Sequence, residues 1–314
     1  MDVLDLLAQL LRPDAPPPLA REAAREELAR AGRLGIQVIT RPQPGYPEGL
    51  RSLADPPRLL YLQGDLAICA ERPAVAIVGS RDATARGRSL AFTLARDLAR
   101  SSVIVVSGLA RGIDTAAHEG ALSAAGGTTI AVQARGLDDV YPAENRALAG
   151  RVLASGGALV SEYALGVGPR PHHFPRRNRI LAGLVRAVVV VEAAEKSGAL
   201  VTARLALESG RDVLAVPGHP FDPRASGTNA LIKDGAGLVR DARDVIDALG
   251  LVAAAAPLHT GDPVLDAIPV TQAVSIEQLA AANGQPIPAL LVRLSELELD
   301  GRVTRLPGPL FVRA

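Results

Sequence analysis

Six short apolar runs recur roughly every 24 to 30 residues along the middle of the chain, and this spacing limits the possible folds more than any other feature. Such continuous runs, separated by helix-length segments, are typical of parallel strands that helices cover on both faces of a sheet. The sequence therefore predicts an α/β fold with a doubly wound, mainly parallel sheet. We expect its strands at AVAIV (74–78), VIVVS (103–107), TTIAV (128–132), ALVSE (158–162), AVVVVE (187–192) and DVLAV (212–216).

The segment before these strands has a different pattern. REAAREELARAG (21–32) combines acidic and apolar residues that suit a short helix ending at a glycine. Residues 40–66 are rich in proline and glycine, which favours an irregular connection wrapped around the main domain. We expect a small N-terminal helical module, followed by this connection.

The segment after the strands is also distinct. An alanine-rich stretch begins at residue 251 and is typical of a linker. Two helical patterns, at 275–284 and 288–303, precede a hairpin that turns at Gly308-Pro309 and carries Arg305 and Arg313. This order is the pattern of a winged helix. We expect an N-terminal module and connection at 1–70, an α/β domain at 71–250, a linker at 251–262 and a winged-helix domain at 263–314.

Composition narrows the class of protein. No run of 18 uncharged apolar residues occurs, which argues against a membrane span, and the acidic start lacks the basic segment of a secretory signal. The single cysteine, Cys69, excludes a disulfide framework and a cysteine-based zinc site. We therefore expect a cytoplasmic protein. Only two of the 34 basic residues are lysines, Lys196 and Lys233, which makes both candidates for positions that need a point charge.

The residues that follow the strands are expected to gather at one edge of the sheet, where open α/β sheets bind ligands. Two of these turns combine glycine with arginine: Gly79-Ser80-Arg81 and SGLARG (107–112). Glycine permits close approach to the backbone, a helix N-terminus attracts anions, and arginine binds phosphate through two nitrogens. One such turn can be a simple strand–helix junction, but several together favour a phosphate site. The first turn lacks the G-x-G-x-x-G pattern of dinucleotide-binding loops.

The segment RPHHFPRRNRILAGLVR (170–186) is the strongest basic feature. It carries five arginines, and no carboxylate occurs between Glu162 and Glu192. A solvated surface helix normally mixes charges, so this bias favours a polyanionic partner. Phe174 could stack on an unpaired base or pack beneath the loop, and the sequence leaves both alternatives open.

The same region also allows a catalytic alternative. Glu162 and Glu192 both follow strands and could act as an acid/base pair on a nucleoside, or could anchor neighbouring arginines. The chain has neither a G-x-S-x-G elbow nor a P-loop motif, and His172-His173 has no further ligands at metal-binding spacing. We therefore expect no metal and no cofactor.

Several of these segments resemble the DNA-processing protein A family (DprA, also called Smf). The resemblance covers most of residues 75–250 in the correct order. It is carried by IVGSR (77–81), SGLARGIDTAAHEGAL (107–122), GLDDVYPAENRAL (136–148), GGALVSE (156–162), HFPRRNRILAGL (173–184), VVVEAAEKSGALVTARLALESGRDVLAVPG (189–218) and NALIKDGA (229–236).

The resemblance implies an extended Rossmann-like domain that binds single-stranded DNA without catalysing a reaction on it. It also implies a homodimer that protects incoming DNA and helps load the RecA recombinase in natural transformation and recombination. The DNA-binding residues that it implies are Gly79, Ser80, Arg81, Ser107, Gly108, Arg111, Gly112, His173, Phe174, Arg176, Arg177, Asn178, Arg179, Lys196, Ser197, Gly198 and Lys233.

An enzyme remains the alternative from a different class. Rossmann-type nucleotide phosphoribohydrolases use a PGGxGT loop followed by a glutamate. The corresponding stretch here, PGHPFDPRASGTN (217–229), lacks that glutamate. The sequence therefore favours the DNA-binding interpretation.

Overall fold

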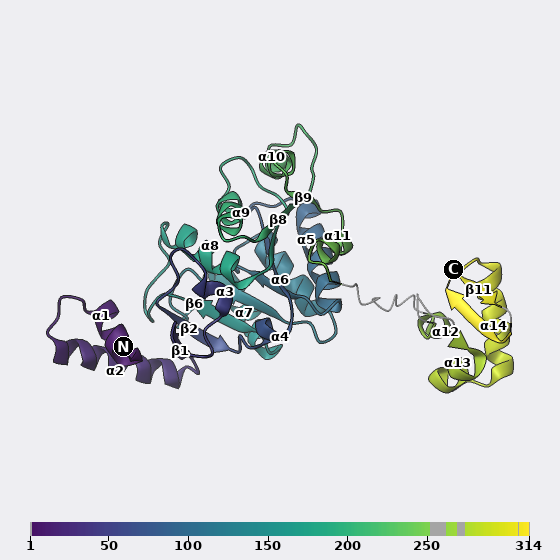
Figure 1. Cartoon of the computed structure of the whole chain (residues 1–314), viewed down its shortest axis with the longest axis horizontal. Coiled ribbons are helices and arrows are strands. Elements are labelled where there is room, and N and C mark those ends of the chain that lie inside the picture. Colours follow the sequence, from purple (N-terminus) through teal and green to yellow (C-terminus); the bar gives the residue numbers. More distant parts are fainter. Residues whose placement is uncertain (1, 252–261, 269–273, 307, 314) are drawn as a thin grey trace. The chain divides into compact units, whose positions relative to one another are not determined.

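The computed structural model describes residues 2–251, 262–268, 274–306 and 308–313 (Figure 1). Their contacts divide the chain into two compact units, Met1–Val252 and Ala253–Ala314. None of the helices in the described ranges is long and apolar enough to cross a membrane.

The larger unit is built on a nine-stranded sheet with the order β1-β2-β6-β5-β4-β3-β7-β8-β9. The strands from β3 onward are parallel, whereas β2 pairs antiparallel with both β1 and β6. The six predicted runs form β3 to β8, so the predicted α/β fold is confirmed. The strands are β1 (Gln37–Thr40), β2 (Leu59–Gly64), β3 (Ala74–Val78), β4 (Ile104–Ser107), β5 (Thr129–Val132), β6 (Ala158–Ser161), β7 (Ala187–Val190), β8 (Asp212–Ala215) and β9 (Gly237–Leu238).

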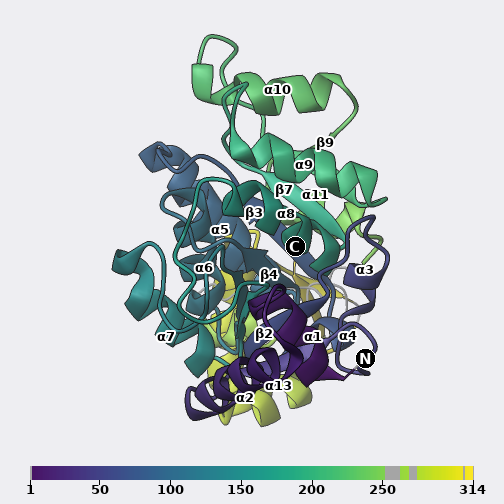
Figure 2. The ribbon, with the colours of Figure 1, turned by 90° about the vertical axis from the view of Figure 1, so that its left-hand side faces the viewer.

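Helices cover both faces of this sheet. On one face, α5 (Ala85–Arg100), α6 (Ile113–Ser123) and α11 (Ala242–Ala248) share a core with alternate residues of β3, such as Val75 and Ile77. On the other face, α3 (Glu48–Arg51), α8 (His173–Leu184) and α9 (Gly198–Glu208) pack on the intervening residues, such as Ala76 and Val78. In Figure 2, α9 and α10 (Ser226–Lys233) lie toward the β8–β9 edge at the top.

The strand order reverses at β3. The chain proceeds from β3 through β4 and β5 to β6, and α8 then carries it back to β7 on the other side of β3. The carboxyl ends of β3 and β7 therefore form the topological switch point, the position at which open α/β sheets leave a crevice for ligands.

The N-terminal helices α1 (Val3–Leu11) and α2 (Pro17–Arg33) pack at the β1–β2 end of the sheet, together with α7 (Arg146–Ala154). The proline-rich stretch that we expected to be an irregular connection contains β2, because its LLYL run is buried on both faces between β1 and β6. Two short helices, α3 and α4 (Ile68–Glu71), flank this strand.

The smaller unit confirms the predicted winged helix. Ser275 and Gln278 form a capping box at the start of α13, and Leu279, Leu294 and Phe311 lie in a separate core. Most of the predicted linker lies outside the described residues, as does the side chain of Arg313. The elements are α12 (Pro263–Asp266), β10 (Val274–Ser275), α13 (Ile276–Asn283), α14 (Ile287–Leu299), β11 (Val303–Leu306) and β12 (Leu310–Arg313).

Candidate functional site

A groove of about 880 Å³ lies at the switch point. Most of its lining comes from three segments: the turn after β3, residues 169–181 that include the first half of α8, and the turn that leads from β7 into α9. Ala110, Asp114 and Tyr141 complete the lining. It brings together nine of the residues proposed from the sequence. These are Gly79, Ser80, Arg81, Phe174, Arg177, Asn178, Lys196, Ser197 and Gly198.

The turn after β3 is held in place from two sides. The Ser80 amide donates to the carbonyl of Glu192 (2.7 Å), and the Ser80 carbonyl accepts from the amide of Ile113 (3.2 Å). A Cβ on Gly79 would lie only 2.6 Å from Cγ1 of Ile113, so this position requires glycine. The fixed turn presents Arg81 to the groove with its side chain exposed.

Two aromatic rings line the groove, with Phe174 beside Arg81 and Tyr141 beside Phe174. The Arg81 guanidinium carbon lies 4.6 Å from the centroid of the Phe174 ring, and the Tyr141 ring lies 5.8 Å from the same ring. Phe174 is half-buried, so it packs in the groove wall and also keeps part of its surface in the groove. The sequence reasoning missed Tyr141, whose signal was its place two residues after the GLDD turn that follows β5.

The floor of the groove contains a buried charge. Arg177 is 4% exposed, and its Nη1 donates to the carbonyl of Val132 (2.8 Å). A Cβ at Gly108 would overlap this guanidinium, so the glycine leaves the space that the Arg177 side chain occupies. Burial lowers the pKa of Arg177 to about 10, while the nearby carboxylate of Asp114 opposes this shift. Arg177 remains charged at neutral pH and adds positive potential beneath the groove.

Asp114 is a buried acidic residue in the floor of the groove. Its carboxylate accepts hydrogen bonds from the amides of Gly108 (3.1 Å) and Ala110 (3.4 Å). Burial raises the pKa of Asp114, and Arg177 opposes that shift. The carboxylate thus shapes the turn after β4, which explains why an acidic residue lies in the floor of a groove whose charged lining is mainly basic.

The N-terminus of α9 forms the other side of the groove. Ser197 caps this helix by accepting from the amide of Ala199 (3.2 Å), and Lys196 directly before it is exposed. Asn178 donates to the carbonyl of Gly198 (3.2 Å) and so ties the turn to α8. A helix N-terminus next to a lysine is a favourable environment for an anion.

The arginines of the basic segment 170–186 do not all face the groove as unpaired charges, although the absence of carboxylates within the segment favoured one positive surface. Arg179 is buried and forms an ion pair with Glu162, and the Nε of Arg176 lies 3.5 Å from the same carboxylate. Burial raises the pKa of Glu162, while Arg179 opposes this shift. Of the two roles that the sequence left open for Glu162, this pairing supports the anchor for neighbouring arginines.

The remaining proposed residues lie outside the groove lining. His173 is buried with its ring stacked on Tyr163 at 4.1 Å, and burial lowers its pKa. The Ser107 hydroxyl is buried and donates to the carbonyl of Ile77 (2.6 Å), and Arg111 pairs with Glu144 at 2.6 Å. Those that the groove lining does not include are Ser107, Gly108, Arg111, Gly112, His173, Arg176, Arg179 and Lys233.

The two glutamates considered as an acid/base pair do not converge. Glu192 follows β7 and accepts from the amide of Thr84 (3.0 Å), whereas Glu162 follows β6. The strands β5, β4 and β3 lie between them, which is a separation of about 19 Å at the usual strand spacing. Glu162 anchors arginines, and Glu192 anchors the start of α5.

A second groove, of about 700 Å³, borders the same two turns. The start of α5 and the loop at 217–225 form most of it, and its charged residues are Arg86, Glu192, Asp222 and Arg224. Phe221, in that loop, is 90% exposed. The stretch that corresponds to the phosphoribohydrolase loop therefore lies here.

Two family models match the chain. The model described as DNA recombination-mediator protein A matches residues 37–250, and the DprA winged helix domain matches residues 252–309. The chain is 39% identical to Protein Smf of Escherichia coli over 277 residues, which covers 84% of this chain and 74% of that protein. It is 41% identical to DNA processing protein DprA of Bacillus subtilis over 222 residues, with 71% and 74% of the two chains covered.

Solved structures agree with these matches. DNA processing protein A from Streptococcus pneumoniae superposes with a TM-score of 0.65 at 37% identity, covering 79% of this chain and 87% of that one. The protein of the same name from Helicobacter pylori, whose structural report concerns its single-stranded DNA binding mode, has a TM-score of 0.61 at 31% identity and covers 68% and 95%. The chain belongs to the DNA recombination-mediator protein A (DprA) family.

Proposed function

We propose that this protein binds single-stranded DNA in the groove at the switch point. One observation carries the proposal: Arg81 and Lys196, on turns from two different strands, are exposed in one groove and have no ion pair with any described carboxylate. The Phe174 ring lies beside Arg81, and the Tyr141 ring lies beside Phe174. Cations for phosphates next to aromatic rings for bases are the two elements that single-strand binding requires.

The balance of charge supports the same proposal. The groove is lined by four basic side chains, of Arg81, Arg170, Arg177 and Lys196, and by two acidic ones, of Asp82 and Asp114. Phosphate contacts position a nucleic acid without reading its sequence, and stacking accepts any base. Binding should therefore favour unpaired strands with little sequence preference. The single-stranded DNA binding of the Helicobacter pylori relative supports the same ligand.

We further propose that the protein acts without catalysis, as a homodimer that protects incoming DNA and assists RecA loading. Support comes from the description of its family as a recombination mediator. Light scattering on the full chain should give twice the 32.5 kDa of the monomer. A monomer at micromolar concentration would contradict the dimer.

Fluorescence anisotropy with labelled single-stranded and double-stranded oligonucleotides of equal length tests the proposed ligand. Tighter binding to the single strand, at similar affinity for different sequences, is the expected result. Preference for the duplex would contradict it. Release of free base from AMP would instead support the phosphoribohydrolase alternative.

A further inference from the structure

The helix α2 lies outside the segment that matches the DNA recombination-mediator protein A model, yet it carries a buried acid. Glu27 is 9% exposed. Its Oε1 accepts from the hydroxyl of Tyr61 on β2 (2.9 Å) and from the backbone amide of Leu165 (2.7 Å). Burial, and then Glu27 itself, raise the pKa of Tyr61, so the hydroxyl keeps the proton that it donates.

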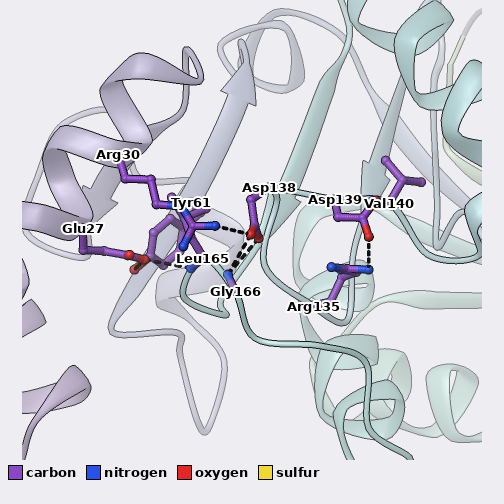
Figure 3. A network of polar contacts seen from close by, with 9 residues as sticks. All are labelled: Glu27, Arg30, Tyr61, Arg135, Asp138, Asp139, Val140, Leu165 and Gly166. Atoms are coloured by element: carbon purple, nitrogen blue, oxygen red, sulfur yellow. Dashed lines mark hydrogen bonds and ion pairs between the residues drawn. The ribbon is translucent and has the colours of Figure 1, made fainter.

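A second contact from α2 acts through Asp138 on Gly166, the residue that follows Leu165 in the loop after β6 (Figure 3). Arg30 Nη2 donates to Oδ2 of Asp138 (2.7 Å), and the Asp138 carboxylate accepts from the amide of Gly166 (2.9 Å). Two consecutive amides, those of Leu165 and Gly166, are thus each held by a carboxylate from a different segment of the chain.

Both loops in this network continue into the groove. The loop after β5 contains Asp138 and leads to Tyr141, and the loop after β6 contains Leu165 and leads to Arg170. The amide of Gly136 also donates to the carbonyl of Val167 (2.9 Å), which joins the loops to each other. Tyr141 and Arg170 both line the groove at the switch point.

We propose that Glu27 and Arg30 are positioning residues, through which α2 fixes the part of the groove wall formed by Tyr141, Pro169 and Arg170. This inference rests on the proposed function. Residues 162–172 form no helix or strand, so each fixed contact removes conformational freedom that DNA binding would otherwise have to restrict. The N-terminal helices therefore prepare the groove without touching the ligand.

The chain offers matched variants for the test. Glu27→Ala and Arg30→Ala remove the contacts, whereas Glu27→Gln retains an oxygen acceptor at the same position. Arg25→Ala is the control on the same helix, because among the residues that the structure describes Arg25 pairs only with Glu22, and both side chains are 60% exposed. Thermal unfolding of each full-length variant shows whether the fold is retained.

Two readouts are compared in the full-length variants: hydrogen exchange over residues 136–141 and 163–170, and affinity for a labelled oligo-dT. Glu27→Ala and Arg30→Ala should speed exchange in both loops and weaken binding about threefold to tenfold. The dependence of binding on salt should stay unchanged, since no phosphate contact is lost. Glu27→Gln should restore most of the affinity, and Arg25→Ala should match the wild type.

Faster exchange with unchanged affinity would overturn the proposal, as would a flatter salt dependence for Arg30→Ala, which would mark Arg30 as a direct DNA contact. Failure of the wild type to bind single strands would refute the proposed function instead. In that case the hydrogen-exchange measurement alone tests the role of α2. Unchanged exchange in both loops of Glu27→Ala and Arg30→Ala would overturn that role.

Discussion

The two grooves that border the turns after β3 and β7 differ in how their charges are balanced. The groove at the switch point has four basic and two acidic side chains in its lining, whereas the second groove has two of each. In the second groove, Glu192 already occupies the N-terminus of α5 by accepting from the amide of Thr84. In the first, the N-terminus of α9 carries the exposed Lys196 instead.

Strand ends and helix N-termini are therefore not sufficient on their own to form an anion-binding site. Both grooves have arginines, a helix N-terminus and a nearby phenylalanine, Phe174 or Phe221. Of these two grooves, only the first has more basic than acidic side chains in its lining. Only the first also has a buried arginine, Arg177, beneath its surface. This balance supports our proposal that single-stranded DNA binds in the first groove.

Removing the buried arginine should have the largest effect. Arg177→Ala leaves the Asp114 carboxylate buried without its compensating charge, which should lower the free energy of unfolding of the larger unit by about 3 kcal/mol. Arg86→Ala, in the exposed wall of the second groove, should change it by less than about 0.5 kcal/mol. Urea unfolding measures both, and a loss below about 1 kcal/mol for Arg177→Ala would show that the floor is not a coupled pair.

The buried histidine behind the first groove should make stability depend on pH. Burial, with a smaller contribution from Arg177, lowers the pKa of His118 from 6.5 to about 3. The imidazole is therefore neutral in the folded protein and takes up a proton on unfolding below pH 6.5. Its contribution to the free energy of unfolding should fall by about 2 kcal/mol between pH 7 and pH 5.

Urea unfolding at both pH values tests this contribution. His118→Asn should lose that part of the pH dependence, whereas His219→Asn, at an exposed position in the second groove, should keep it. Equal pH dependence in the wild type and His118→Asn would contradict the prediction.

The two phenylalanines should differ in binding. Phe174→Ala should weaken binding of oligo-dT by about 1–2 kcal/mol at every salt concentration, because stacking releases no counterions. Phe221→Ala should leave the affinity unchanged, although Phe221 is the more exposed ring. Anisotropy titrations at several salt concentrations measure both. A larger loss for Phe221→Ala would place the DNA in the second groove.

The fold could be predicted from the sequence where one local pattern allows a single structure. The continuous apolar runs are typical of buried parallel strands, and the convergence of parallel strand ends at one edge predicted a phosphate site at the turn that carries Arg81. Lys196 was added to this site by the resemblance to the DprA family. Strand β2 was missed because prolines surround it and its partners lie far away in the sequence. The burial of Arg177 and Arg179 depends on Val132 and Glu162, which come from other elements. Charge pairing across a sheet has no local signal.

A salt titration of two double variants tests the central assignment most directly. Arg81→Ala/Lys196→Ala removes the exposed cations of the first groove, and Arg86→Ala/Arg224→Ala removes those of the second. The first should bind oligo-dT at least about 150-fold more weakly, at about 1.5–3 kcal/mol per lost charge-assisted contact, and should flatten the slope of log K against log salt by about 1.4. The second should match the wild type in affinity and slope. Equal losses in both variants, or a loss confined to the second, would contradict the assignment of DNA to the switch-point groove.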